Sequence, residues 1–386
     1  MSNFDWYKVR FLESSANLKP LIKARTGRTP STSIAREIAV CVQQGRLFYE
    51  AAAGCPLEIR PLLLFYGMGA LARALVVART LRPLSTLRHS HGLTDISEQR
   101  SRLRDLRVKV GATGTFQEFN DVVSPLSRTC YFGASSKPSA VYTASATSGE
   151  LRDLELSLKD ILSRIPGLDD LYRNTFNEEA NTRTVMINFW AEYGDYCELR
   201  IDDSELFSDR PSLRRLVQKW RDRYPFLQRW RFVRAAHAWG NSVIQFANTE
   251  CLGIDEFGED QLAGVNGQFQ MITDLMRNRA TSRMAISSIL PPMGGGYPGG
   301  YPNAIAPING LYPSELSLHY LGLFLLSSLV RYRPDTWGHA ISRSVLADRP
   351  TDDELLALLE RFMEINVRII PAMTVQVLNP HEDRYA

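Results

Sequence analysis

The sequence predicts an α+β fold, mainly α, in which N- and C-terminal helical blocks pack together with a small antiparallel β-sheet between them. Near both ends of the chain, apolar residues recur at helical spacing, whereas in the middle they alternate as in half-buried strands. The chain has 386 residues, of which 44% are hydrophobic. It can therefore bury a sizeable core, and it exceeds the usual size of one domain.

The first helical region, residues 31–180, follows an N-terminal arm of residues 1–30. A Ser-Thr-Ser run supplies candidate N-caps at its start, and apolar residues then recur at helical spacing as far as Gly54. A second helix is expected roughly from Ile59 to Arg79, and it is apolar almost all round, as is typical of a helix surrounded by protein. The two helices are expected to form an antiparallel hairpin.

The remainder of this region is an irregular insert. After Gly92 the chain is first charged and then rich in Gly, Thr, Ser and Pro up to about Gly149, which indicates short elements and loops. A helix is predicted from Glu150 to Ile165, because leucines recur on one face, and Gly167 would end it.

The middle region, residues 181–290, is predicted to form the antiparallel sheet. From Thr182 the apolar and polar residues alternate, and a partner strand contains Cys197, after a turn at Gly194. Two more strand-like runs, RFVRAAHAW and SVIQFANTE, are separated by a Gly-Asn turn and predict a second hairpin.

The C-terminal helical block, residues 314–386, follows a Gly/Pro-rich segment, residues 291–313. This segment cannot be regular helix, and its spaced tyrosines favour an ordered surface loop or lid. Beyond it, one apolar helix is expected to reach about Tyr332, and a short helix to begin near Pro334. A final amphipathic helix would be capped by Thr351 and the two aspartates that follow it.

The composition argues against several classes of protein. Lys and Arg number 45 and Asp and Glu number 42, so the net charge of +3 is small, and no basic tail indicates a protein that coats nucleic acid. A local basic patch is compatible with these numbers. Five cysteines without a CxxC pair argue against a disulfide scaffold and against zinc ligands close together in sequence, and no cofactor is expected.

Two apolar stretches need comparison with membrane-spanning helices. The stretch from Ile59 to Ala78 contains two arginines, and the stretch from Leu316 to Val330 is short and contains a histidine. Both are interpreted as buried core helices. The N-terminus has no apolar run after a basic start, so the protein is expected in the cytoplasm, without a membrane partner.

No familiar catalytic or phosphate-binding motif is present, but two segments resemble one family. The run AREIAVCVQQGRLFYEAAAGCPLEIRPLLLFYGMGALARAL, followed at a distance by His91-Gly92, is similar to the first recognisable block of the bacterial YaaC-like family. The run LSLHYLGLFLLSSLVRYRPDTW is similar to the second block. The resemblance implies an intracellular bacterial protein, and it implies no known activity.

The hairpin also resembles the helix pair of HEPN domains, in which a second helix rich in Tyr and Ala is followed by His-Gly. Many HEPN proteins are ribonucleases in which an Arg and a His, four to six residues apart, stabilise phosphate charge and transfer a proton. This resemblance implies RNA or a nucleotide as ligand. It also implies a homodimer, because HEPN-like hairpins often pair.

Three pairs fit the Arg–His spacing: Arg82 with His89, Arg333 with His339, and Arg231 with His237. The third pair lies on a predicted strand, where the HEPN pattern would not place it. Arg82 and Arg333 are each followed by Pro, whereas HEPN nucleases usually carry a polar residue there. Both pairs are kept as candidate catalytic residues, and Arg333 with His339 is preferred because the two begin a helix beside Trp337.

Arg73 and His91 are the candidate ligand-binding residues. Arg73 lies in an otherwise apolar helix, and an isolated buried guanidinium is very unfavourable. It must therefore pair with a carboxylate on the preceding helix, such as Glu37 or Glu50, or face a cavity that holds an anion.

A metal site at the HxH formed by His89 and His91 would need a further ligand, such as the carboxylate of Asp95. Two histidines alone do not make a site. No metal is therefore assigned.

Two hypotheses for function follow, and whether the protein is an enzyme stays open. The first is an HEPN-like protein that binds RNA or a nucleotide in stress or phage defence, either without catalysis or as a conditional ribonuclease. The second is a non-enzymatic scaffold or regulatory protein that binds a protein partner through an exposed apolar surface. A metal-dependent hydrolase ranks third, because it would need carboxylates beside the two histidines.

Overall fold

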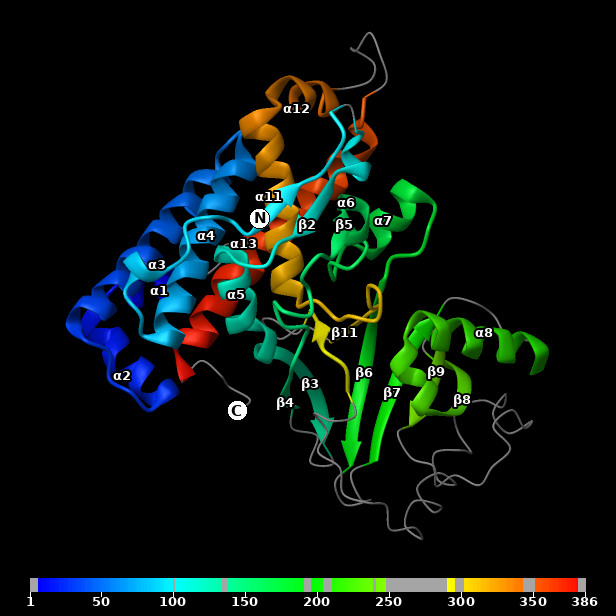
Figure 1. The fold of residues 1–386 in the computed structure, drawn as a ribbon. Coiled ribbons are helices and arrows are strands. Elements are labelled where there is room, and N and C mark those ends of the chain that lie inside the picture. The colour runs from blue at the N-terminus through cyan, green and yellow to red at the C-terminus, as the bar shows by residue number, and fades with distance from the viewer. Residues whose placement is uncertain are drawn as a thin grey trace. The chain divides into compact units, whose positions relative to one another are not determined.

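The computed structural model describes residues 6–99, 101–133, 138–190, 196–203, 210–238, 241–247, 290–295, 302–342 and 351–380 (Figure 1). The chain divides into two compact units. The first consists of Met1–Pro125, Ala146–Ala180 and Pro313–Arg384, and the second of Leu126–Ser145, Asn181–Tyr312 and Tyr385–Ala386. Helices from both ends of the chain pack in one unit, and the residues that separate them along the chain form a mostly antiparallel sheet. This arrangement confirms the predicted α+β fold, mainly α.

The first unit is mainly helical. The predicted hairpin is present: the Ser31 hydroxyl accepts a hydrogen bond from the Ile34 N–H and caps the first of its helices, which ends before Gly54. The helices of this unit are α1 (Trp6–Phe11), α2 (Ser15–Thr26), α3 (Thr32–Ala53), α4 (Arg60–Thr80), α5 (Thr115–Val123), α6 (Leu158–Leu162), α7 (Asp169–Phe176), α11 (Glu315–Tyr332), α12 (Pro334–Ala340) and α13 (Leu356–Leu378).

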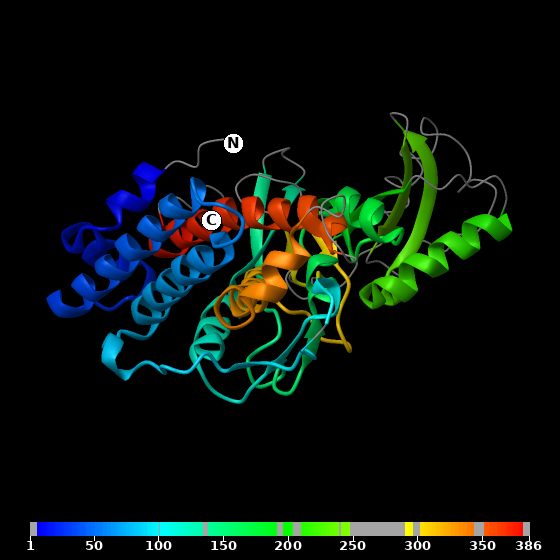
Figure 2. The ribbon, with the colours of Figure 1, turned by 90° about the horizontal axis from the view of Figure 1, so that it is seen from above.

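Helix α4 is the core of this unit and contacts α3, α11 and α13. Both views show α3 and α4 side by side (Figures 1 and 2). The two helices approach closely where a glycine faces a large side chain, since a Cβ on Gly67 would lie 2.8 Å from the Tyr49 ring. Among the described residues, α4 alone is long and apolar enough to span a membrane, but 72% of its apolar window is buried inside the protein. This burial fits the predicted core helix.

One sequence prediction for this unit is wrong. The N-terminal arm contains α1 and α2, and the insert contains α5 as one of its short elements. The predicted helix 150–165 is mostly a turn and strand β5 (Glu155–Ser157), because residues there pair with β2 (Arg107–Val110), which also pairs with β1 (Leu93–Asp95). Helix α6 begins only after Ser157, whose side chain forms a capping box with Asp160.

The second unit is a mostly antiparallel sheet with strand order β10-β11-β6-β7-β9-β8, and β3 adds a parallel pairing to β6 and an antiparallel one to β4. Both predicted hairpins are confirmed, β6 with β7 and β8 with β9. The strands are β3 (Ser127–Gly133), β4 (Pro138–Thr143), β6 (Thr182–Trp190), β7 (Tyr196–Asp203), β8 (Arg231–Ala238), β9 (Asn241–Ala247), β10 (Met293–Gly294) and β11 (Asn303–Ile305).

The Gly/Pro-rich segment is not simply a surface loop. Its described parts include β10 and β11, which pair with each other, and β11 also pairs with β6, so backbone hydrogen bonds fix it at one edge of the sheet. Met293 and Ala304 are buried. Residues 296–301 lie outside the described part of the chain, and so does the lid expected there.

One helix of the second unit, α8 (Arg210–Arg223), escaped the sequence analysis because half of its residues are charged. Its few apolar residues recur at helical spacing, and all of them are buried among strand residues such as Ile187, Ile201 and Phe246. They are Leu213, Leu216, Val217 and Trp220.

Candidate functional site

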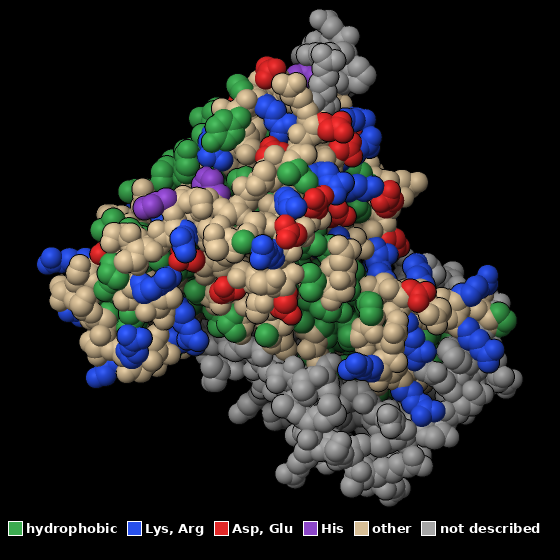
Figure 3. Space-filling view, viewed as in Figure 1, with side chains coloured by type: hydrophobic (Ala, Val, Ile, Leu, Met, Phe, Trp, Pro, Cys, Tyr) green, Lys and Arg blue, Asp and Glu red, His purple; other side chains and the backbone are tan. Residues whose placement is uncertain are grey.

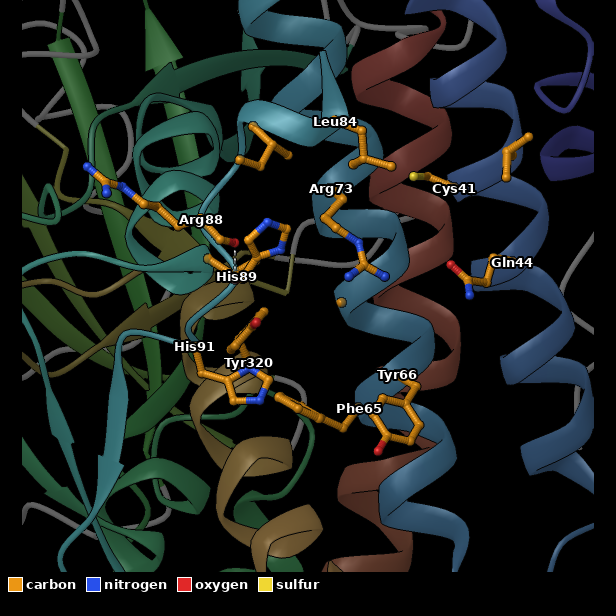
Figure 4. A pocket seen from close by; sticks show the side chains of 14 residues that line it. Cys41, Gln44, Phe65, Tyr66, Arg73, Leu84, Arg88, His89, His91 and Tyr320 are labelled. Carbon is orange, nitrogen blue, oxygen red and sulfur yellow. Dashed lines mark hydrogen bonds between the residues drawn. The ribbon is translucent and has the colours of Figure 1, made fainter. Parts of the chain in front are cut away.

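A pocket of about 330 Å³ lies in the first unit, between the α3–α4 hairpin, the connector after α4 (residues 81–92) and helix α11 (Figure 4). The side chains around it are mainly apolar and aromatic, with a few cationic and amide groups. They are Val40, Cys41 and Gln44 from α3; Phe65, Tyr66, Gly69 and Arg73 from α4; Leu84, Leu87, Arg88, His89 and His91 from the connector; Thr115 from α5; and Tyr320 from α11.

The connector is held in place by the first turn of α5. Thr115 donates its backbone N–H to the Ser90 carbonyl at 2.8 Å and its hydroxyl to the Ser90 and Arg88 carbonyls. The Phe116 N–H donates to the His91 carbonyl at 3.1 Å. These bonds fix the backbone that carries both histidines.

Gly92 follows His91 and explains the His-Gly pair in the sequence. Its φ of +72° lies in the left-handed region, and a Cβ there would overlap Gln117 Oε1 and lie 2.9 Å from Gly114 Cα, which leaves no room for a side chain. The Gly92 carbonyl accepts hydrogen bonds from the Gly111 N–H and the Gln117 amide, both at 2.9 Å. The chain therefore turns sharply after His91, whose side chain faces the pocket (Figure 4).

Arg73 points its guanidinium into the middle of the pocket (Figure 4). Its Nε is buried and has no hydrogen-bond partner, and within the described part of the chain no carboxylate lies within 4.0 Å of the guanidinium. Glu37 accepts a hydrogen bond from the Leu84 N–H, and Glu50 pairs with Arg46 and Arg10. Neither glutamate forms the ion pair with Arg73 that the sequence suggested.

His91 is half-buried, with its ring against Phe65 and Phe324 at centroid distances of 5.3 and 5.9 Å. Burial lowers the pKa of His91, and the positive charges of Arg331 and Arg73 lower it further. His91 is therefore mainly neutral near pH 7, with a nitrogen able to accept a proton. Arg331 itself lies over the Phe65 ring, 5.5 Å from its centroid.

Two weakly acidic side chains that line the pocket with Arg73, Cys41 and Tyr320, do not supply a negative charge. Burial raises the pKa of the Cys41 thiol, although the adjacent Arg73 partly opposes this shift. Burial also raises the pKa of Tyr320 well above its usual range. Both groups are neutral at pH 7, so neither forms an ion pair with Arg73.

The two predicted catalytic pairs do not come together in this pocket. Of the first pair, His89 lines it, whereas Arg82 is exposed and pairs with Glu118 at 2.9 Å. Neither Arg333 nor His339 lines it. Arg333 pairs with Asp95 at 2.5 Å, and His339 is half-buried on α12.

The other sequence candidates separate in the same way. Arg231 and His237 lie on β8 in the second unit. Asp95, the carboxylate considered as a metal ligand beside His89 and His91, instead bonds Arg333 and Ser97. Within the described ranges, no three His, Cys, Asp or Glu side chains gather as a metal site would require. Arg73 and His91, the two candidate ligand-binding residues, do share one pocket.

Sequence reasoning missed several residues of the pocket. Gln44 in the middle of α3 and Arg88 in the connector gave no signal, because isolated polar residues are common in helices and loops. Phe65 and Tyr320 lie inside the two segments that carry the family resemblance, so those segments held information about the site. The structure shows that the two segments meet, since the rings of Phe65 and Tyr320 lie 5.5 Å apart.

The fold and the pocket define a mainly helical α+β protein with a cationic, aromatic-lined cavity. The sequence model of the family described as YaaC-like Protein matches residues 9–378, and the chain belongs to this family. This match confirms the YaaC-like resemblance, and the HEPN-like resemblance of the hairpin is not confirmed. A search of the curated proteins gives no match, and a search of the solved structures gives none either.

Proposed function

We propose that this protein binds a small phosphate-bearing ligand with an aromatic ring, such as a nucleotide, in the pocket around Arg73. One observation carries the proposal: a guanidinium points into an apolar cavity with a buried, unpartnered Nε and no carboxylate beside it. An uncompensated buried cation is unfavourable, and a bound anion removes the penalty. Guanidinium groups match phosphate oxygens in geometry as well as charge.

The other pocket residues support a ligand that is aromatic as well as anionic. Phe65, Tyr66 and Tyr320 offer ring faces or edges, which stack well with nucleobases, and Gln44 offers an amide opposite Arg73 (Figure 4). A volume of about 330 Å³ lies at the small end of the usual range for ligand pockets. A mononucleotide or the end of a single RNA strand fits this size better than a duplex.

The proposal also includes the more specific expectations of the HEPN-like hypothesis. These are that the protein is a conditional ribonuclease in bacterial stress or phage defence, that it acts in the cytoplasm, and that it forms a homodimer. His89 and His91 face one cavity with Arg73, so both types of group that metal-independent RNA cleavage needs are present together.

The scaffold hypothesis has its own observation. Val40, Leu47 and Tyr66 are exposed on the α3–α4 hairpin, with exposed fractions of 60%, 52% and 40%. A partner protein could cover them. We favour the ligand hypothesis because a partner on this surface would not by itself neutralise Arg73.

Titration calorimetry of the purified protein with nucleoside monophosphates and with inorganic phosphate tests the proposal. We expect binding to at least one nucleotide, and Arg73→Gln should weaken it roughly tenfold to a hundredfold, because a charged hydrogen bond contributes about 1.5–3 kcal/mol. Arg79→Gln is the matched control, since Arg79 is exposed near the end of the same helix. Absence of binding, or an equal loss in both variants, would exclude the proposal.

A further inference from the structure

One segment of the second unit is strongly basic. Residues 210–231 contain eight Lys or Arg and one acidic residue, Asp222, which gives +7. The whole chain has 45 basic and 42 acidic residues, so the other residues have 37 basic and 41 acidic, a net charge of −4. The small overall charge therefore conceals a basic region within a chain that is otherwise slightly acidic.

Helix α8 and the turn after it present this charge at the surface. Arg214, Arg215 and Arg229 are exposed, and Lys219 and Arg231 are partly exposed. Figure 3 shows Lys and Arg side chains gathered over α8. This basic α8 surface belongs to the second unit, whereas the Arg73 pocket belongs to the first.

The chemistry of the basic α8 surface favours phosphate over other anions. Four of the five exposed or partly exposed residues named above are arginines, whose planar guanidinium binds phosphate oxygens in pairs. The apolar face of α8 is fully used inside the sheet core, with Leu213, Leu216 and Trp220 all buried. The helix has therefore no apolar face to insert into a lipid bilayer, as membrane-surface helices have.

We infer that the basic α8 surface binds the phosphate backbone of nucleic acid, independently of base sequence. Exposed arginines on a rigid helix can contact successive phosphates, and such contacts release counterions and fall off steeply with salt. The inference does not depend on the nucleotide pocket proposed above, because it rests on a different unit of the structure.

Fluorescence anisotropy of a labelled single-stranded RNA, measured at several salt concentrations, tests the inference. The test variant carries Arg214→Gln, Arg215→Gln and Arg229→Gln. The matched control removes the same charge from exposed residues of the first unit, with Lys23→Gln, Arg28→Gln and Arg79→Gln. Circular dichroism checks that both variants are folded.

We expect the α8 variant to bind at least tenfold more weakly at low salt, and its log–log salt slope to become shallower by about 2, since each phosphate contact in a single strand contributes about 0.7. The control variant should bind like the wild type. Equal losses in the two variants, no binding by the wild type, or stronger binding to anionic phospholipid vesicles than to RNA would each overturn the inference. Nucleotide binding at the pocket should be the same in the α8 variant and the wild type, so the two proposals can fail separately.

Discussion

Gly114 packs against the backbone of Gly92 so closely that a Cβ at Gly114 would overlap the Gly92 amide nitrogen. This contact joins the start of α5 to the connector that carries His89 and His91. The two glycines lie outside the pocket, but they set the position of one of its walls.

We expect Gly114→Ala to destabilise the protein by about 1–3 kcal/mol, since an added methyl group at a closed contact forces the backbone apart. Urea unfolding followed by circular dichroism measures this change. Gly338→Ala is the matched control, because nothing lies within 4 Å of a Cβ there, and it should leave stability unchanged or raise it slightly. Equal effects of the two substitutions would show that the contact does not matter.

Ligand affinity should depend on pH through His91. Arg73 of α4 and Arg331 of α11 face this histidine, and both lower its pKa in the free protein. A bound phosphate would partly cancel these charges and raise the pKa of His91, so binding would take up a proton and strengthen as the pH falls below about 6.5.

Calorimetry at several pH values, in buffers with different heats of protonation, measures the affinity and the proton uptake. His91→Asn should bind with a much flatter pH profile. If the affinity of His91→Asn had the same pH profile as that of the wild type, the proton taken up on binding would belong to another group.

His319 should make the protein sensitive to acid. Both ring nitrogens lack a hydrogen-bond partner, the ring stacks on Phe362 at 5.1 Å, and burial lowers the pKa of His319 to about 3. The unfolded chain binds a proton near pH 6.5 while the folded chain does not, so the free energy of unfolding falls as the pH drops from about 6.5 towards 3. The slope from this group approaches about 1.4 kcal/mol per pH unit.

His319→Leu should remove that slope and raise stability at pH 7 by about 1–3 kcal/mol, because a buried group without partners is replaced by an apolar one. His319→Gln should remove the slope without the gain, since it stays polar. Urea unfolding at pH 7 and pH 5 compares the three proteins. A wild-type slope retained in both variants would contradict the assignment to His319.

Tyr49 and Asn366 should be coupled energetically. The buried Tyr49 hydroxyl donates to the Asn366 side-chain oxygen at 2.8 Å and joins α3 to α13, which are far apart in sequence. Tyr49→Phe should lower the free energy of unfolding by about 1–3 kcal/mol, because it leaves the Asn366 oxygen without this donor. Adding Asn366→Leu should recover part of the loss. Strict additivity of the two substitutions in urea unfolding would exclude the coupling.

The sequence predicted the elements whose pattern is local. Helices α3, α4 and α11 and the hairpins β6–β7 and β8–β9 all have clear periodicity and turn residues, and all are present. The helix predicted over 150–165 failed because pairing with β2, a contact with a distant segment, overrides the local leucine pattern. Helix α8 was missed because packing on the sheet, more than its own composition, stabilises it.

In the candidate site, too, local sequence patterns could be interpreted, whereas contacts between distant segments could not. Arg73 could be selected from sequence, because a charged residue in an apolar helix must have a partner or a cavity. The Arg–His spacing could not identify a site, since Glu118 and Asp95 engage Arg82 and Arg333 and neither arginine lines the pocket. These ion pairs join residues that are far apart in sequence, so no local pattern reveals them.

The connector's attachment to α5 limits how this protein can be divided or redesigned. An excised α3–α4 hairpin would retain Arg73 but lose the facing histidines, which depend on Thr115 and Phe116 for their backbone position. A chimera that transfers the site to another helical protein would have to include residues 31–123 and the Tyr320 region of α11 as a set. The recognition chemistry of this molecule is therefore a property of its assembled first unit and cannot be carried by any one continuous stretch of chain.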